Sequence, residues 1–324
     1  MKHSIKIIFQ FFFIVFSLIT GFFFWGSSSV NPLKDKNKII TRNTNITHST
    51  DSIFSIATYN IGYLSGMTNN LPVAKPKSLF DNNLEQVKLV LKPLNIDILA
   101  FQEIDFAASR SYDVNQQLEI AKLGYPFIGQ SVNWDKRYLP FPYWPISVQF
   151  GRVYSGQSVL SKYPIKKQDR IVLKAVADAP FYRTAFYLDR LAQVDKIDIE
   201  GKTLVIINVH LEAFDKTTRM LQTKRVLKLY NSYKDDYPTL LVGDFNSDIK
   251  YPNASITPII KSANIGIAAY NTHYPNTYSS VKPVKRIDYI FYNKNFIAEV
   301  SSRVVSEMGD ASDHLPLLMT FKLK

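Results

Sequence analysis

The residues of this chain best suited to chemistry are polar side chains placed where apolar, strand-like runs end. Six such clusters follow one another along the sequence: Tyr59-Asn60, Gln102-Glu103, Asn208-Val209-His210, Gly243-Asp244-Phe245-Asn246, Arg286-Ile287-Asp288-Tyr289 and Ser312-Asp313-His314-Leu315-Pro316-Leu317. Burying a polar side chain at the end of a strand is costly unless it meets a partner, a metal or a substrate. The six clusters therefore predict one shared site.

The two histidines in these clusters are candidates for acid–base chemistry. His314 stands beside Asp313 just before an apolar run, and an imidazole placed there can act as a general acid or base. Asp288 would fix the tautomer of this histidine and raise its basicity. His210 would donate to a phosphate oxygen and stabilise charge that develops in a transition state. A lone histidine more often packs in the core, so these roles depend on the residues meeting in the fold.

The carboxylates and amides in the clusters are candidates for holding a hard cation and a phosphate. Glu103 ends an apolar run, where a carboxylate is a natural ligand for Mg²⁺ or Mn²⁺, although a plain surface position is the alternative. Asn60 would hold a carboxylate or phosphate in place, or only cap a turn. Asp244 and Asn246 can face the same way in extended backbone, so one would accept a proton from water while the other donates to phosphate. A simple Asx turn is the alternative for this pair.

Composition excludes several other classes of site. The chain has 324 residues, of which 46% are hydrophobic and 20% charged, as in an ordinary globular protein. It contains no cysteine and five histidines, which rules out disulfides, a thiolate nucleophile and Cys-ligated zinc, and argues against a multi-histidine zinc cage. The formal net charge of +12 suits an anionic substrate such as a phosphate ester or an acidic lipid surface, or serves solubility alone.

An apolar segment opens the chain. Residues 7–25 follow Lys2 and Lys6 and contain eight Phe. At about 1.5 Å per residue, a helix of this length just spans a bilayer core. The pattern predicts a secretory signal or an uncleaved signal anchor in residues 1–29, followed by a flexible tether in residues 30–51. We therefore expect an exported protein that is either membrane-anchored or secreted to a compartment such as the periplasm.

From residue 52 onward, strand-like and helix-like patterns alternate. Strands are expected near residues 53–60, 96–101, 158–161, 168–173, 184–188, 191–199, 203–211, 239–242, 287–292 and 315–323. Helices are expected around residues 84–91, 118–123, 226–233 and 256–264. Strands outnumber helices, and helices fall between groups of strands, which favours an α/β sandwich of two packed sheets with helices outside. The pattern indicates one domain over residues 52–324.

Taken in order, the six clusters resemble those of the endonuclease/exonuclease/phosphatase superfamily, which includes pancreatic-type deoxyribonuclease and neutral sphingomyelinases. The resemblance covers residues 56–317, which is most of the chain. It implies a four-layer α/β sandwich with two packed mixed β-sheets flanked by helices, preceded here by an N-terminal apolar helix. It also implies hydrolysis of a phosphodiester by attack of water, with Mg²⁺ or Mn²⁺ as the cofactor and His314 as general acid/base.

The resemblance divides the candidate residues into a catalytic set and a metal-binding set. The catalytic set would orient water and phosphate, stabilise the phosphate and move a proton: His210, Asp244, Asn246, Asp288 and His314. The metal-binding set supplies the main ligand, a supporting amide and a second nearby carboxylate: Glu103, Asn60 and Asp313. The chain departs from the pattern at Gly62, where some endonuclease relatives carry an acid. This departure weakens a base-excision function and puts a second metal in doubt.

The substrate is less well defined by the sequence. Residues 134–154 are predicted to form an aromatic loop that stacks on bases, sits at a membrane interface or packs on the sandwich. Arg152, Arg183 and Arg190 would engage phosphate or be solvated. We expect a monomer that acts on a nucleic acid or a phospholipid headgroup, with membrane contact through the N-terminal segment if it is not cleaved. The alternative is a non-catalytic envelope module that binds lipid or a protein partner through the aromatic loop.

Overall fold

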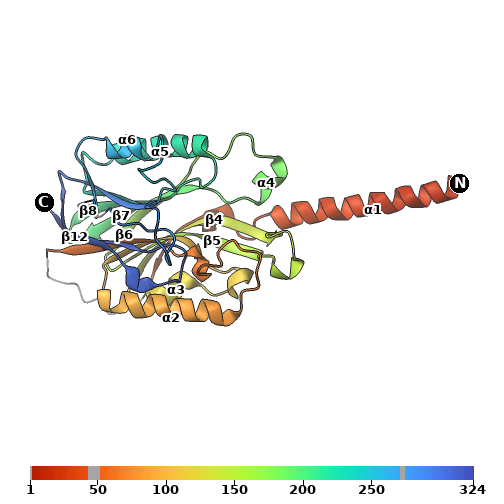
Figure 1. Ribbon diagram of the computed structural model, residues 1–324, viewed down its shortest axis with the longest axis horizontal. Helices are drawn as coiled ribbons and strands as arrows, with labels where there is room; N and C mark the ends of the chain where they lie inside the picture. Colours follow the sequence, from red (N-terminus) through yellow and green to blue (C-terminus); the bar gives the residue numbers. More distant parts are fainter. Residues whose placement is uncertain (1, 43–51, 271–273) are drawn as a thin grey trace.

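Two β-sheets pack face to face, and helices cover their outer faces (Figure 1). The computed structural model describes residues 2–42, 52–270 and 274–324. The seven-stranded sheet has the spatial order β1 (Asn37–Thr41), β4 (Phe127–Leu139), β5 (Gly151–Ser161), β3 (Ile98–Asp105), β2 (Phe54–Asn60), β13 (Leu317–Leu323) and β12 (Ile297–Val304). The six-stranded sheet has the order β10 (Ile265–Ile267), β11 (Asp288–Asn293), β9 (Thr239–Asp244), β8 (Lys202–His210), β7 (Leu191–Ile199) and β6 (Ile165–Val172).

Both sheets are mixed. In the larger sheet β2 and β3 run parallel, and in the smaller sheet β8 and β9 run parallel, while the other paired neighbours run antiparallel. On the outside, α2 (Lys77–Leu94) and α3 (Gln116–Ala121) cover the larger sheet, and α5 (Lys216–Asn231) and α6 (Thr257–Ile260) cover the smaller one (Figure 1). The predicted four-layer α/β sandwich is confirmed.

Apolar clusters hold the four layers together. Between the sheets lie branched aliphatic side chains from both, among them Ile56, Ile98, Ile206 and Val242. The helical spacing recognised in the sequence faces the core, because α2 buries Leu84, Val87 and Leu91 against the larger sheet, and α5 buries its own row against the smaller sheet. Each fully buried aliphatic side chain contributes about 1.5–3 kcal/mol. The sandwich therefore provides a rigid base for the strand ends.

The hairpin between β7 and β8 follows the sequence prediction closely. The strand predicted over residues 191–199 is the observed β7, and Glu200 and Gly201 form the turn with φ of 52° and 85°. Two consecutive positive φ values are the geometry that matches the twist of a two-residue hairpin. The helix expected over residues 256–264 is shorter, because only Thr257–Ile260 is helical.

The predicted tether over residues 30–51 is wrong for its first part. A short 3₁₀ turn, η1 (Leu33–Lys36), leads into β1, which pairs antiparallel with β4 from Asn37 opposite Ser131 to Thr41 opposite Phe127. Without β1, the backbone of β4 would be an unpaired edge, and adding a strand satisfies it. The folded domain therefore begins before residue 52. Residues 43–51 of the predicted tether lie outside the described residues.

The aromatic loop predicted over residues 134–154 is also wrong at both ends. Its first residues complete β4 and its last residues begin β5, which leaves residues 140–150 as the connection. Trp134 is buried with Phe150 and Tyr63 and is not exposed to solvent. Tyr143 and Trp144, in the middle of the connection, are exposed. The long β4–β5 ladder overrides the aromatic and proline-rich composition that looked like loop.

The strand predicted over residues 184–188 is wrong, because residues 184–186 are helical and residues 187 and 188 are irregular. Pro180 precedes α4 (Phe181–Phe186), which connects β6 to β7. A run of five residues is too short for its periodicity to distinguish a strand from a helix. Four other short 3₁₀ turns lie in connections: η2 (Gly62–Leu64), η3 (Ser109–Ser111), η4 (Ile146–Val148) and η5 (Ser306–Met308).

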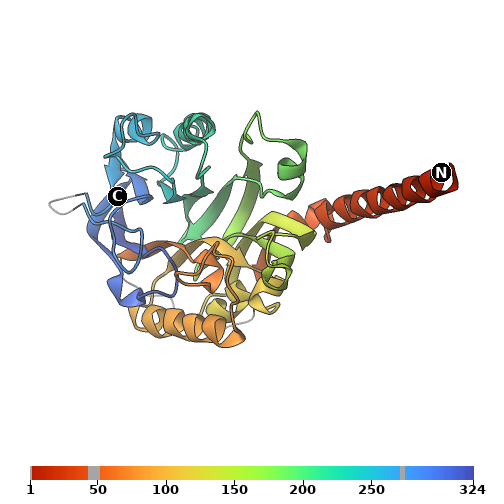
Figure 2. The same cartoon turned by 45° about the vertical axis from the view of Figure 1, so that its right-hand side comes forward.

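The N-terminal apolar segment is helical. Helix α1 (Lys2–Ser27) projects away from the sandwich, as Figures 1 and 2 both show. Within the described residues it is the one helix long and apolar enough to cross a membrane, over His3–Ser27. Whether it is a cleaved signal or an anchor stays a prediction.

A buried acid between the sheets generates a testable prediction. Burial raises the pKa of Asp195 in β7 well above its ordinary value, and the Gln193 amide opposes this shift only in part. Because the folded-state pKa is the higher one, the folded protein binds this proton more tightly. The resulting stability is complete below the unfolded pKa of about 3.9 and is lost as the pH rises toward the folded pKa.

We therefore expect Asp195→Asn to stabilise the protein at neutral pH, by up to about 1.4 kcal/mol for each pH unit above the unfolded pKa until the folded pKa is reached. Urea unfolding at pH 4 and pH 7 measures this. The exposed acid Asp235 provides a control, since Asp235→Asn should change little at either pH. A pH-independent difference for Asp195→Asn would contradict the assignment.

Candidate active site

The polar clusters meet at one edge of the sandwich because of strand direction. The parallel strands β2 and β3 both end at this edge, which brings Asn60 beside Gln102. The parallel strands β8 and β9 end at the same edge of the other sheet, where His210 pairs with Asp244. Strand β11 begins there, with Asp288 opposite Asp244. The predicted shared site therefore exists as a meeting of strand ends.

Asn60 lies at the centre of the meeting point. Its Nδ2 donates to Glu103 Oε1 (3.3 Å) and to Asp244 Oδ2 (3.1 Å), and lies 3.5 Å from His314 Nε2. Its Oδ1 accepts from the Gly62 backbone N–H (3.1 Å). One amide thus joins both sheets and orients two carboxylates, which is the orienting role considered for Asn60.

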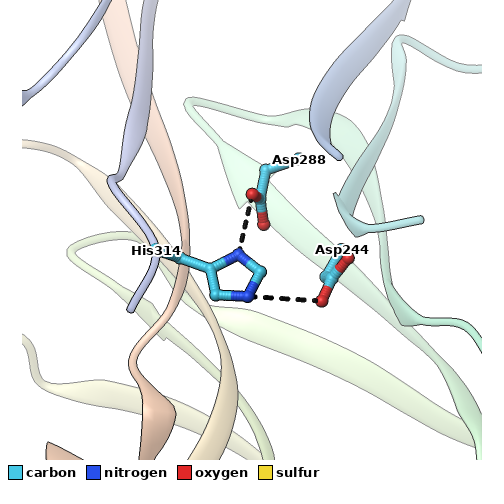
Figure 3. Close-up of side chains that lie close together, drawn as sticks. All are labelled: Asp244, Asp288 and His314. Carbon is cyan, nitrogen blue, oxygen red and sulfur yellow. Dashed lines mark hydrogen bonds and ion pairs between the residues drawn. The ribbon is translucent and has the colours of Figure 1, made fainter. Parts of the chain in front are cut away.

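His314 and Asp288 form a buried pair (Figure 3). His314 Nδ1 lies 2.9 Å from Asp288 Oδ2, which also accepts from the Thr277 hydroxyl (2.6 Å), and His314 Nε2 lies 3.9 Å from Asp244 Oδ2. Burial alone would lower the pKa of His314, but Asp288 and then Asp244 raise it well above its usual value. The imidazole is therefore oriented through Nδ1 and holds a proton at Nε2, toward Asp244.

Asp244 and Asn246 are linked as a turn and also face the site. The Asn246 backbone N–H donates to Asp244 Oδ1 (2.8 Å), and the Asn246 amide reaches both Leu211 O (3.0 Å) and Asp244 Oδ2 (3.3 Å). Burial, followed by Asp288, raises the pKa of Asp244 to about 7. This carboxylate can accept a proton near neutral pH.

Gly243 is required by the approach of β8 to β9. It has φ of 132°, and a Cβ there would lie 2.0 Å from Val209 O. A side chain at this position would force apart the two strands that deliver His210 and Asp244.

Glu103 occupies a strained position in β3. Its φ is 50°, within a register shift between Phe101 and Ile104, and a non-glycine residue in the left-handed region is uncommon. Asn69 Nδ2 donates to Glu103 Oε2 (3.0 Å) and lies 3.5 Å from Asp313 Oδ1. Strain of this kind persists where the surroundings impose it and is concentrated at functional sites.

Asn69 was not identified from the sequence. It lies in a polar connection after η2, and no strand or spacing pattern marks it. Its position between Glu103 and Asp313 is set by the tertiary fold alone. The same holds for Thr277, which donates to Asp288 from a connection outside the six clusters.

His210 is arranged differently from the role considered for it. Arg190 Nη1 lies 2.6 Å from His210 Nε2, and an arginine can only donate, so this ring nitrogen accepts. Burial, then Arg190 and His314, lowers the pKa of His210 well below its usual value. His210 is therefore neutral and does not present an Nε2–H to a phosphate in this arrangement.

Arg190 is the cation that stands beside His210. It is buried, and Tyr187 and Glu212 hold its other nitrogens at 3.1 and 3.4 Å. Of the three arginines considered for phosphate binding, Arg152 instead pairs with Asp113 at the surface, and Arg183 is exposed on α4. Arg190 is the one placed at the site.

Two groups of side chains offer ligand atoms for a metal. Among the described residues, ligand atoms of Asp244, Asp288 and His314 lie within 4.8 Å of one another. However, Asp288 already occupies His314 Nδ1, and a histidine with a raised pKa is a poor ligand because metals bind the neutral ring. Glu103 and Asp313 fit a hard cation better, since burial and then Asp313 raise the pKa of Glu103, and a cation between them would relieve that repulsion.

The glycine at position 62, where some endonuclease relatives carry an acid, lies in a crowded part of the site. A Cβ at Gly62 would lie 2.8 Å from Ser312 Oγ and 3.0 Å from Asp313 Oδ1, and the residue has φ of 52°. The backbone therefore leaves little room for an acidic side chain here.

The chain belongs to the endonuclease/exonuclease/phosphatase family, whose model matches residues 57–314. This confirms the resemblance read from the sequence, and membership supports the coarse assignment of a phosphoester hydrolase. Among curated relatives, the UPF0294 proteins of Vibrio cholerae and Vibrio campbellii are 26% identical over 125 and 128 residues. These matches span 38% of this chain and 42% and 41% of the relatives, so less than half of each relative is covered.

Solved structures share the fold. An endonuclease/exonuclease/phosphatase from Beutenbergia cavernae aligns with a TM-score of 0.62 at 19% identity, covering 84% of this chain and 72% of that one. The human Nocturnin catalytic domain with bound sulfate gives 0.60 at 18% identity, covering 91% and 100%. Zebrafish (D. rerio) TDP2 complexed with single-strand DNA product gives 0.59 at 17% identity, covering 84% and 100%.

The crowding of Glu103 and Asp313 predicts that the glutamate lowers the stability of the metal-free protein and is needed for Mg²⁺ to stabilise it. In the presence of a chelator, we expect Glu103→Gln to melt above the unmodified protein, since it removes a buried charge worth about 1 kcal/mol or more of repulsion and desolvation. Added Mg²⁺ should raise the melting temperature of the unmodified protein much more than that of the variant, because only the former keeps its ligand. Thermal unfolding with and without Mg²⁺ tests both statements.

The exposed glutamate of α2 offers a matched control, as Glu85→Gln should behave like the unmodified protein in both conditions. Equal stabilisation of Glu103→Gln and the unmodified protein by Mg²⁺ would remove Glu103 from the cation site.

Proposed function

We propose that this protein is a divalent-metal-dependent phosphodiesterase in which water attacks phosphorus directly and His314 acts as general acid/base. The single observation that carries the proposal is the buried His314–Asp288 pair, whose free nitrogen faces Asp244 across a site flanked by Glu103 and Asp313. A structural ion pair would not need two further carboxylates crowded beside it.

In the proposed reaction, the oxygen of water forms a bond to phosphorus while the bond from phosphorus to the leaving oxygen breaks. The products are a phosphomonoester and an alcohol. Asp244 accepts a proton from the attacking water, and Asn246 holds that carboxylate in place. His314, protonated at Nε2 and held by Asp288, donates its proton to the leaving oxygen as the alcohol departs. Asp244 then releases the proton taken from water and His314 is reprotonated, which restores both groups for the next turnover.

Two positive elements would balance the phosphate charge. Arg190 presents a guanidinium that Tyr187 and Glu212 orient, and it reaches the site at His210. Mg²⁺ or Mn²⁺ held by Glu103 and Asp313, with Asn60 and Asn69 orienting the ligands, would neutralise phosphate oxygens and acidify water. Neutral His210 fills the space between Arg190 and the carboxylates and keeps the guanidinium in place.

The proton-transfer roles predict a large loss of turnover. We expect His314→Ala and Asp244→Ala each to lower kcat at least about 100-fold, on the scale of general acid–base catalysis. Hydrolysis of bis-p-nitrophenyl phosphate by the full chain measures this, with circular dichroism to verify folding. Asp235→Ala, at an exposed acid, is the control. Near-normal rates for folded His314→Ala would refute the assignment.

Metal removal separates the enzyme from a binding module. We expect a chelator to abolish hydrolysis of bis-p-nitrophenyl phosphate, and Mg²⁺ or Mn²⁺ to restore it, because Glu103 and Asp313 lose their counter-charge without metal. The assay is repeated on plasmid DNA and sphingomyelin. Inertness toward every substrate in the presence of metal, together with binding to vesicles, would instead favour the non-catalytic module that binds through the aromatic connection.

A further inference from the structure

The apolar helix leaves the domain from the same edge as the site. Strands β3 and β4 both run antiparallel to β5, so β4 ends at the edge where β3 delivers its polar residues. The end of α1 is tied to that part of β4, since the Arg137 N–H donates to Ser28 O (3.0 Å) and the Val30 N–H donates to Asp135 Oδ1 (2.9 Å). A membrane crossed by α1 would therefore face the active-site edge and not the opposite one (Figure 1).

The junction between helix and domain is packed. The rings of Phe22 and Trp25 contact Tyr138 of β4, with centroids 5.6 and 6.4 Å apart. Phe23 contacts Phe181 and Phe186 of α4 at 5.7 and 5.5 Å. These contacts join α1 to strand β4 and to helix α4 of the domain, so α1 sets the orientation of the domain and is not a loose tether.

Exposed aromatic side chains lie in two connections at the edge from which the helix leaves. Tyr143 and Trp144, in the connection from β4 to β5, are 72% and 76% exposed, and Phe181 and Tyr182 of α4 are 76% and 55% exposed. Both connections lie at the active-site edge, because β5 and β7 begin there; Leu191, the first residue of β7, pairs with His210. We call these four residues the aromatic rim.

A lipid surface is the occupant that fits the aromatic rim. Tyr and Trp, with an apolar ring and a polar handle, favour the boundary between lipid and water. Exposed Arg183 lies on α4 with Phe181 and Tyr182. Exposed Arg137 lies near the end of β4, where it donates to the Ser28 hydroxyl (3.1 Å). Both guanidinium groups would meet lipid phosphates. Because the aromatic rim lies at the edge from which a membrane-length helix leaves, the membrane that the helix crosses would cover the exposed rings. A nucleic-acid groove would instead be expected to show clustered Lys and Arg.

The rim continues into the site. The segment that carries Phe181 and Tyr182 leads through Tyr187 to Arg190, whose guanidinium contacts His210. A headgroup lying against the rim would thus have its phosphate near the cation proposed to balance phosphate charge.

We propose that α1 is retained as an anchor, that the aromatic rim rests on the same membrane, and that the substrate is the headgroup phosphodiester of a membrane phospholipid. This inference rests on the proposed phosphodiesterase function and adds to it the place and class of the substrate. The anchored domain would act on lipids of the membrane that holds it.

A depth measurement tests the placement. The chain contains no cysteine, so Trp144→Cys in the full chain provides a unique site for an environment-sensitive fluorophore. In vesicles of phosphatidylcholine and phosphatidylglycerol, we expect a blue-shifted emission that nitroxide-labelled lipids quench. Leu89→Cys, at a 71% exposed position on α2, is the matched control and should report water. Aqueous emission from both positions would overturn the placement.

An activity comparison tests the substrate class. For full-length protein in the same vesicles, we expect Tyr143→Ser/Trp144→Ser to lower headgroup release at least about 10-fold while hydrolysis of soluble bis-p-nitrophenyl phosphate changes less than about 2-fold, since the rim is a surface contact and not part of the proton-transfer machinery. Leu89→Ser should alter neither rate.

The outcomes distinguish the two proposals. Equal rates of headgroup release by the double variant and the unmodified protein would overturn the proposal that the aromatic rim contacts lipid substrate. Faster cleavage of plasmid DNA than of vesicle lipid would overturn it as well. Either result would leave the phosphodiesterase proposal standing. If bis-p-nitrophenyl phosphate, lipid and DNA are all inert with Mg²⁺ present, the phosphodiesterase proposal itself fails, and this inference fails with it.

Discussion

Mutual repulsion among buried and half-buried carboxylates is the constraint on which this site depends. Asp244 and Asp288, which are buried, converge with the half-buried Glu103 and Asp313, and burial makes negative charge costly at this position. The protein relieves the cost locally, since His314 sits between Asp288 and Asp244, and the amides of Asn60 and Asn69 donate to the others. The negative charge of Glu103 and Asp313 is the least offset by neighbouring donors, which is why a cation is expected between them.

The sandwich makes this concentration of charge tolerable. Two parallel strand pairs, β2/β3 and β8/β9, end at the same edge and deliver their polar ends from a dry aliphatic core. The strain that remains is confined to a few backbone positions, notably Glu103 and Gly243. A rigid base holds reactive groups at fixed distances, which is what proton transfer and phosphate binding require.

The same edge of the sandwich also carries exposed aromatic and apolar side chains. The charged site lies at the strand ends of the two sheets. The aromatic rim, on the connections that carry η4 and α4, and the end of α1 lie at the same edge. Evolution of the connections can change where the site is presented without disturbing the residues that do the chemistry. Membership of the family thus defines the reaction class, and the connections define what reaches it.

The sequence by itself determined the fold class and most of the residues that form the site, because apolar periodicity and polar strand ends are local properties of the chain. It identified β7 to the residue and placed His314, Asp288 and Asp244 in one site. Only the tertiary structure decided that residues 37–41 complete a sheet, that Asn69, Thr277 and Arg190 support the site, and that His210 accepts a hydrogen bond. Those facts depend on neighbours distant in sequence, and no local pattern encodes which side chains share a space.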